Sequence, residues 1–160
     1  FLVKRGIQIL LCVGGDGGLR GAHAIAQAAI RKGYSLAVVG VPKTIDNDVP
    51  YVTVTFGYQT AVEEARNVLD SAHNEARAQV NGVGLVKLMG REAGFIAAGA
   101  TLASQEVNFT LIPEAPFRMD KFLMALQERL LDRGHAVIAV AEGAGQELLR
   151  DPAAQVGRAA

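Results

Sequence analysis

The sequence predicts an α/β protein of three layers, α/β/α, built on mostly parallel β-sheets. First, short apolar runs rich in β-branched residues recur along the 160 residues and alternate with helix-like segments. Second, these runs are continuous in apolar character, a pattern typical of strands that are covered on both faces. The runs expected to form strands are Ile7–Val13, Leu36–Val41, Val83–Leu88, Val107–Ile112 and Ala136–Ala141.

The segments between these runs carry apolar residues at helical spacing. Residues 19–32 end at Gly33, which favours a helix stop. Residues 60–79 place their apolar side chains on one stripe and keep most charged residues outside it. Residues 93–105 are alanine-rich, and residues 119–132 show a similar helical pattern. Because helices alternate with strands, right-handed crossovers are expected between the strands.

A change in pattern divides the chain. Residues 49–60 interrupt the alternation of strands and helices, so a domain junction is expected there. We therefore predict one α/β part over residues 1–60 and a second over residues 61–150. Residues 151–160 have little apolar content and are expected to form a tail.

Composition restricts the class of ligand and the location. The chain has 16 basic and 16 acidic residues and a formal net charge of zero, which argues against binding to nucleic acid or to an anionic membrane. No apolar run approaches the roughly 18 residues needed to span a bilayer. The single cysteine, Cys12, cannot form an intrachain disulfide, so a reducing compartment, the cytoplasm, is expected. His23, His73 and His135 show no metal-ligand spacing and are interpreted as structural.

The first expected strand ends in GGDGG, at residues 14–18. Glycines let the backbone turn sharply and approach a ligand, and the N–H groups at a helix start can hold an anion. A carboxylate among phosphates needs a divalent cation between them, so Asp16 predicts a Mg²⁺ site. The alternative is an ordinary turn in which Asp16 caps a helix.

The second expected strand ends in PKTIDND, at residues 42–48. Asp46 can accept a proton from a substrate hydroxyl, and Thr44 can hold a phosphate oxygen. Lys43 adds a compact positive charge, and Asp48 can orient a neighbour or a metal-bound water. The alternative is a turn, because Asp and Asn favour turns by themselves.

The later strand ends are polar as well. Arg91 follows the third strand, where its guanidinium can bind a phosphate through two N–H groups. Glu114 follows the fourth strand and can accept hydrogen bonds from a polyhydroxy substrate, and Glu142 after the fifth is a weaker candidate. A surface arginine paired with a nearby acid is the alternative for Arg91. Ligands collect at the carboxyl ends of the strands in such folds, so these side chains are the candidates for function.

Taken together, these motifs resemble the phosphofructokinase family over roughly residues 7–146. GGDG alone is shared with lipid kinases and NAD kinases, whereas PKTIDND followed by MGR and PE is specific. The matching pieces stand in the family's order: GGDG at 14–17, PKTIDND at 42–48, FGYQTAVEEA at 56–65, GLVKLMGREAGFIA at 84–97 and LIPEAPF at 111–117. The resemblance implies parts of two Rossmann-like domains, with residues 1–60 on the nucleotide side and 61–150 on the sugar-phosphate side.

The implied reaction is phosphoryl transfer to the 1-hydroxyl of fructose 6-phosphate, which yields the 1,6-bisphosphate. By resemblance, Asp46 is the general base, and the catalytic group consists of Thr44, Asp46, Asp48 and Arg91. The substrate-binding residues implied in the same way are Thr44, Ile45, Asp46, Met89, Gly90, Arg91 and Glu114.

The resemblance also implies how the phosphoryl donor is bound. The residues implied to contact it are Gly15, Asp16, Gly17, Gly18 and Lys43, with Asp16 as the Mg²⁺ ligand. In this family, glycine at the position of Gly17 goes with ATP, and aspartate there goes with pyrophosphate. Lysine at the position of Lys43 is usual in pyrophosphate users, but beside Gly17 it resembles the plant and protist-type ATP branch. ATP is therefore the expected donor, and pyrophosphate is the alternative.

Three departures from the family pattern lead us to expect a fragment. Gly18 stands where the family usually has serine or threonine. The family's N-terminal strand and nucleotide loop should precede Phe1, and a later sugar-phosphate segment should follow AEGAG. A truncated, non-catalytic or regulatory chain is thus an alternative to an enzyme. Family members are usually homodimers or homotetramers, so a homo-oligomer is expected.

Overall fold

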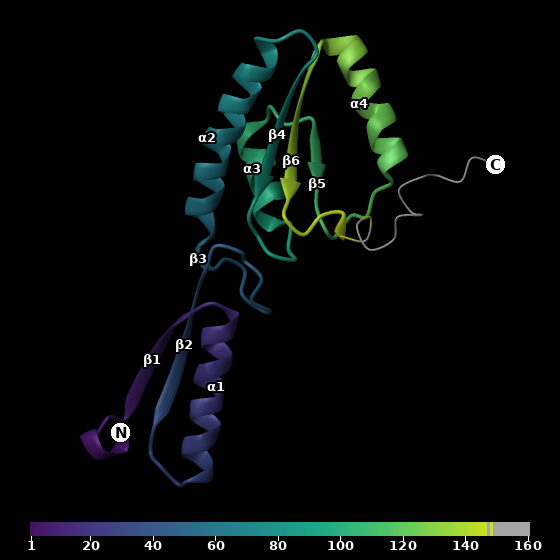
Figure 1. Ribbon diagram of the computed structural model, residues 1–160. Helices are drawn as coiled ribbons and strands as arrows, with labels where there is room; N and C mark the ends of the chain where they lie inside the picture. Colours follow the sequence, from purple (N-terminus) through teal and green to yellow (C-terminus); the bar gives the residue numbers. More distant parts are fainter. Residues whose placement is uncertain (147, 149–160) are drawn as a thin grey trace, which may run out of the picture. The chain divides into compact units, whose positions relative to one another are not determined.

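The computed structural model describes residues 1–146 and 148. They divide into two compact units, Phe1–Tyr58 and a second unit that begins at Gln59 (Figure 1). The division lies close to the junction expected at residues 49–60, whereas the predicted tail, residues 151–160, lies outside the described residues.

The first unit is a parallel three-stranded sheet of order β1-β2-β3 with one long helix. Its elements are η1 (Val3–Arg5), β1 (Ile9–Gly14), α1 (Asp16–Arg31), β2 (Ala37–Thr44) and β3 (Phe56–Gly57). Helix α1 connects β1 to β2 and packs against both (Figure 1). The register places Gly14 beside Pro42, so the strand ends that carry the two polar motifs are neighbours.

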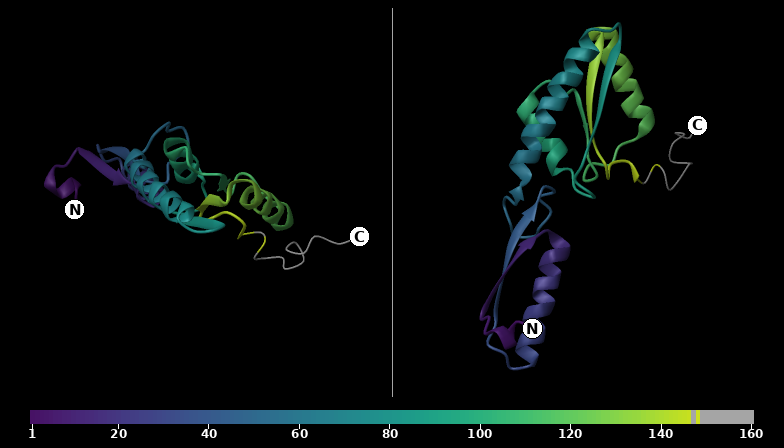
Figure 2. Two further views of the ribbon diagram at one scale, coloured as in Figure 1. Left: turned by 90° about the horizontal axis from the view of Figure 1, so that it is seen from above. Right: turned by 60° about the vertical axis from the view of Figure 1, so that its left-hand side comes forward.

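The second unit is a parallel sheet of order β4-β6-β5 between helices. Its elements are α2 (Tyr58–Arg77), β4 (Gly82–Leu88), α3 (Phe95–Ser104), β5 (Phe109–Leu111), α4 (Met119–Arg133) and β6 (His135–Ala141). Ala72 of α2 lies against Gly84 on one face, and Phe122 of α4 contacts Phe109 on the other. Figures 1 and 2 accordingly show α2 and α4 on opposite sides of the sheet, which confirms the three layers for this unit.

The core of the second unit is centred on β6. Ala136, Val137 and Ala139 of this strand are fully buried, and Ile138 is 3% exposed. Strand β6 lies between β4 and β5, which cover both its edges, and the burial of its successive side chains shows that both its faces are covered as well. This strand therefore fits the predicted pattern of an apolar run buried on both faces.

Strand β1 departs from that pattern. Ile9, Leu11 and Val13 are 66%, 65% and 63% exposed, while the residues between them are half-buried. Exposed and half-buried residues alternate because α1 packs against one face of β1, whereas no helix of the described residues packs against the other face. Leu85 on β4 is similarly 67% exposed. Val39 on β2 is 45% exposed as well. The expectation of full coverage was therefore wrong for these three strands within the described residues.

Helix α2 packs closely against β4 because residue 84 of the strand is a glycine. A Cβ at Gly84 would stand 2.9 Å from the Ala72 carbonyl oxygen and 3.2 Å from the Ala72 Cβ. We therefore expect Gly84→Ala to lower the free energy of unfolding by about 1–3 kcal/mol, the usual cost of overpacking.

The matched control is Gly21→Ala in α1, where a Cβ would meet nothing within 4 Å. Alanine is the better helix former, so this variant is expected to gain about 0.5–1 kcal/mol. Urea unfolding of both variants checks the pair. Equal effects of the two substitutions would contradict the close-packing argument.

Candidate active site

Strand β1 leads directly into α1, and Gly17 and Gly18 in the first turn of this helix are exposed to solvent. Gly15 precedes the helix in an extended conformation, and Asp16 is the first helical residue. The first helical hydrogen bond runs from the Leu19 N–H to the Gly15 carbonyl, at 2.9 Å. The N–H groups before Leu19 thus have no acceptor within the helix, which is the usual basis of an anion site. Helix α1 begins earlier than expected, so Gly17 and Gly18 lie in its first turn.

Asp16 is held by Arg20, one helical turn further on. The Arg20 Nε donates to Asp16 Oδ1 at 3.0 Å, and the Arg20 Nη2 binds Oδ2. The hydrogen bond to Asp16 raises the pKa of Arg20 above its usual value. Both side chains reach solvent, so the pair contributes little stability and can open for a cation. Sequence reasoning did not name Arg20, although its i,i+4 spacing from Asp16 is a readable signal.

The β1 turn lies directly against the end of β2. A Cβ at Gly15 would stand 3.4 Å from the Thr44 Cβ and 3.7 Å from the Lys43 carbonyl oxygen. The structure therefore brings together three of the predicted residues, Gly15, Lys43 and Thr44. Around Gly17 and Gly18 the space is open, since a Cβ at either position would meet nothing within 4 Å.

In the PKTIDND segment the Thr44 hydroxyl fixes the Asp46 carboxylate. The Thr44 Oγ1 donates to Asp46 Oδ2 at 3.0 Å and accepts from the Asp46 N–H at 3.2 Å. Both residues are half-buried, whereas Lys43 is exposed. A carboxylate held in this way has an acceptor oxygen in a defined position, as a general base requires.

The same segment also contains the turn that the sequence left open as an alternative. Asn47 adopts a left-handed backbone conformation with φ of 56°. Its Oδ1 accepts the Thr55 N–H at 2.9 Å, and its Nδ2 donates to the Thr53 carbonyl at 3.3 Å. The turn and the polar cluster thus coexist, and Asp48 is half-buried just beyond them.

In the second unit, Gly90 and Arg91 form a tight turn after β4. Gly90 has φ of 142° and Arg91 has φ of 56°, a left-handed conformation that costs a non-glycine residue about 1–2 kcal/mol. Glu142 stabilises this turn, because its Oε1 accepts the Arg91 N–H at 2.6 Å and the Gly90 N–H at 3.3 Å. Gly143 allows the close approach, since a Cβ there would lie 2.5 Å from the Arg91 carbonyl oxygen.

Glu114 has a comparable structural contact. Its Oε1 accepts the N–H of Gly94, the residue that precedes α3, at 2.8 Å. One Glu114 oxygen is therefore engaged by the chain, and its contact with a sugar hydroxyl stays a prediction. Glu142 was the weaker candidate from sequence, and it binds the backbone of the turn formed by Met89, Gly90 and Arg91, called here the MGR turn. Met89 is exposed.

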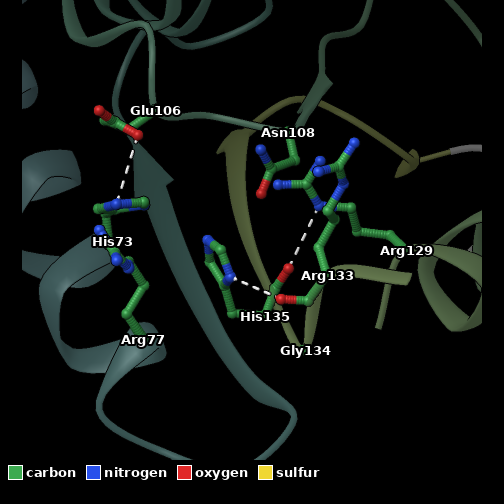
Figure 3. Close-up of a pocket in the computed structure, with 8 residues that line it drawn as sticks. All are labelled: His73, Arg77, Glu106, Asn108, Arg129, Arg133, Gly134 and His135. Atoms are coloured by element: carbon green, nitrogen blue, oxygen red, sulfur yellow. Dashed lines mark hydrogen bonds and ion pairs between the residues drawn. The ribbon is translucent and has the colours of Figure 1, made fainter. Parts of the chain in front are cut away.

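A separate cavity of about 700 Å³ lies at the other end of the second unit's sheet (Figure 3). Its lining consists of His73, Arg77, Glu106, Asn108, Arg129, Arg133, Gly134 and His135. The His73 Nε2 lies 3.3 Å from Glu106 Oε2, and the Arg129 Nε donates to the His135 carbonyl at 3.3 Å. The cavity borders the first residue of β6, whereas Arg91 and Glu142 follow the last residues of β4 and β6. It is therefore distinct from the predicted catalytic residues of this unit.

The acidic residues limit how a metal can be held. Within residues 1–146 and 148, no group of three or more His, Cys, Asp or Glu side chains is arranged to hold a metal ion. A Mg²⁺ ion at Asp16 would therefore need phosphate oxygens as further ligands, which is its common mode of binding. In the same part of the chain, none of the helices combines the length and apolar character needed to cross a bilayer.

The Glu142 contact generates a prediction. Glu142→Ala leaves the Gly90 and Arg91 N–H groups without their acceptor, and we expect a loss of about 1–3 kcal/mol in the free energy of unfolding. Glu142→Gln keeps an acceptor oxygen and should lose less. Urea unfolding and hydrogen exchange of the Arg91 amide measure both effects.

The control is Glu128→Ala on the exposed side of α4, with an expected change within about 0.5 kcal/mol. A Glu142→Ala variant as stable as the unmodified protein would show that the contact contributes nothing. Glutamine as damaging as alanine would show that charge, rather than the acceptor, is what matters.

Known proteins are similar to this chain over most of its length. ATP-dependent 6-phosphofructokinase 7 of Arabidopsis thaliana is 50% identical over 148 residues, which cover 91% of this chain and 30% of that protein. The ATP-dependent 6-phosphofructokinase of Entamoeba histolytica is 47% identical over 146 residues, which cover 91% of this chain and 34% of that protein. The chain thus spans about a third of the length of these relatives.

Solved structures and a family model agree with these relatives. A pyrophosphate-dependent phosphofructokinase from Marinobacter aquaeolei superposes with a TM-score of 0.78 and 31% identity, over 89% of this chain and 38% of that chain. Pichia pastoris phosphofructokinase gives a TM-score of 0.81 and 26% identity, over 92% and 17%. The phosphofructokinase family model matches residues 1–158, and the chain therefore belongs to the phosphofructokinase family.

Proposed function

We propose that the full-length protein is a 6-phosphofructokinase of glycolysis. It transfers the γ-phosphoryl group of ATP to the 1-hydroxyl of fructose 6-phosphate and so forms fructose 1,6-bisphosphate. The observation that carries the proposal is the Thr44–Asp46 hydrogen bond at the end of β2, directly beside Gly15 of the β1 turn. A fixed carboxylate thereby lies next to a helix start suited to phosphates.

Asp46 is the group that accepts the proton of the sugar hydroxyl. The Thr44 hydroxyl donates to Asp46 Oδ2, so the carboxylate keeps its orientation before substrate binds. Lys43 offers an exposed positive charge at the same strand end. In the second unit, Arg91 supplies a guanidinium for phosphate on a turn that Glu142 holds. Catalysis of this kind depends on positioning and on neutralising charge.

The residues at the start of α1 fit Mg²⁺ carried by the donor phosphates. Asp16 offers carboxylate oxygens, the ligands Mg²⁺ prefers, and its exposed pair with Arg20 can open to admit the ion. Asp16 would hold Mg²⁺, and the bound ion would neutralise charge on the phosphates. The open space around Gly17 and Gly18 leaves room for those phosphates.

The names of the relatives favour ATP over pyrophosphate. The relative from Arabidopsis named ATP-dependent is 50% identical to this chain, whereas the solved structure named pyrophosphate-dependent is 31% identical. The remaining alternatives are a pyrophosphate-dependent enzyme and a truncated chain without catalytic activity.

Two assays decide between these functions. The full-length protein and the 160-residue chain are each supplied with fructose 6-phosphate, Mg²⁺ and either ATP or pyrophosphate. We expect turnover with ATP by the full-length protein. Turnover with pyrophosphate alone would overturn the choice of donor, and a full-length protein inactive with both donors would overturn the proposed function.

The proposal extends to location and assembly. The cytoplasm is proposed because the single cysteine of this chain, Cys12, fits a reducing compartment, and a homodimer or homotetramer is proposed because the family resemblance implies one. Cell fractionation tests the location, and light scattering of the full-length protein tests the assembly.

Replacing the general base should remove most of the activity. For Asp46→Ser in the full-length protein we expect turnover to fall by about 10²–10⁴-fold, with little change in sugar binding. Steady-state kinetics with ATP measures kcat and KM. The control is Asp132→Ser on the exposed end of α4, which should leave both constants unchanged. An unaltered kcat in Asp46→Ser would exclude Asp46 as the base.

The donor site can be tested at Gly17. Because a Cβ there meets nothing within 4 Å, Gly17→Asp fits the fold. Its carboxylate would repel the ATP phosphates, so we expect kcat/KM for ATP to fall by about 10²-fold or more.

Gly21→Asp, further along α1 and also in open space, is the matched control and should retain activity with ATP. Full activity of Gly17→Asp with ATP would contradict the placement of the donor at this helix start.

A further inference from the structure

Thr55 is the polar residue that the first unit buries most deeply. Thr55 is 2% exposed. The other buried side chains of the described residues are apolar. Sequence reasoning did not select it, because it lies in a segment expected to be a junction. A buried hydroxyl needs a hydrogen-bond partner, so the contacts of Thr55 indicate what holds it in place.

The hydroxyl and the backbone N–H of Thr55 are both directed at the segment that carries Asp46, whereas its carbonyl accepts the Tyr58 N–H at 3.3 Å. Its Oγ1 donates to the Thr44 carbonyl at 2.8 Å and also lies 3.3 Å from Asn47 Oδ1. Its N–H donates to the same Asn47 oxygen at 2.9 Å. Thr55 thus contacts the residue before and the residue after the pair Ile45-Asp46, and the chain between these two contacts is very short.

Neighbouring contacts support the same arrangement. Thr44 pairs with Gly57 and Lys43 pairs with Phe56 in the short β3 ladder, so the strand end is fixed as well. A Cβ at Gly57 would lie 3.4 Å from Ile45 Cγ2, which shows how closely the two segments pack. The left-handed conformation of Asn47 lets its side chain turn back toward Thr55.

We propose that Thr55 is a positioning residue, which sets the orientation of the Asp46 carboxylate by holding the backbone at Thr44 and Asn47. The inference rests on the proposed function, since it assigns Asp46 the role of base. Thr55 touches no reacting atom in this account. It acts through Thr44, whose hydroxyl donates to Asp46 Oδ2.

The test uses the full-length protein and Thr55→Val, which exchanges the hydroxyl for a methyl group of similar size. A small displacement of a catalytic group costs far more turnover than substrate binding, so we expect kcat to fall by about 10- to 100-fold, with KM for fructose 6-phosphate within about threefold. Thr53→Val, an exposed residue two positions earlier that contributes only its carbonyl, is the matched control and should keep both constants.

Two further comparisons separate positioning from a merely structural role. Thr55→Ser and Thr55→Ala both lose the methyl group and differ only in the hydroxyl, so serine should retain kcat within about threefold of the unmodified enzyme while alanine shows the loss seen with valine. In an Asp46→Ser background, Thr55→Val should lower kcat no further, because the group it positions is gone.

The outcomes distinguish this inference from the proposed function. An unmodified full-length protein that does not phosphorylate fructose 6-phosphate defeats the proposed function and the inference with it. A normal kcat in Thr55→Val, equal losses in the serine and alanine variants, or full additivity with Asp46→Ser defeats the inference alone. If neither the valine nor the alanine variant folds, as judged by circular dichroism, Thr55 is a folding determinant and the positioning role is also rejected.

Discussion

The parallel pairing of β1 with β2 is the constraint on which the candidate site of the first unit depends. Its register places Gly14 beside Pro42, so the glycine-rich turn and the PKTIDND segment leave the sheet at adjacent points. A shift of one residue would carry each side chain to the opposite face. The start of α1 and the Asp46 carboxylate are neighbours because these strands pair in this register, although Asp16 and Asp46 lie 30 positions apart in the sequence.

Hydrogen bonds to the backbone help to hold Thr44 in the first unit and the turn at Gly90 and Arg91 in the second, whereas Asp16 is held by its ion pair with Arg20. In the first unit the Thr44 carbonyl and hydroxyl each take part in a hydrogen bond, and Asn47 turns the chain back. In the second unit the Glu142 carboxylate receives two N–H groups of the MGR turn. Under the proposed function, backbone held by hydrogen bonds at both places would reduce the reorganisation needed when substrate binds, which is how positioned groups lower a barrier.

Much of this could be predicted from sequence, and the remainder has a physical reason. Hydrophobic spacing located the α-helices and the strands other than the short β3, and the order of residues in PKTIDND singled out Asp46 and Thr44. Thr55 was missed because its partners lie up to 11 residues away, across a turn whose path the sequence pattern does not describe. Glu142 was underrated because its contact with the Arg91 N–H joins residues 51 positions apart.

One face of β1 is covered by no residue that the structure describes, and this affects how the 160-residue chain behaves when it is prepared by itself. Ile9, Leu11 and Val13 form an apolar row along one side of a strand, and Val39 of β2 adds to it. Apolar rows of this kind promote self-association, since they can bury one another. If the isolated 160-residue chain is inactive, aggregation must first be excluded, for example by gel filtration at several concentrations. Only then does the inactivity say anything about catalysis.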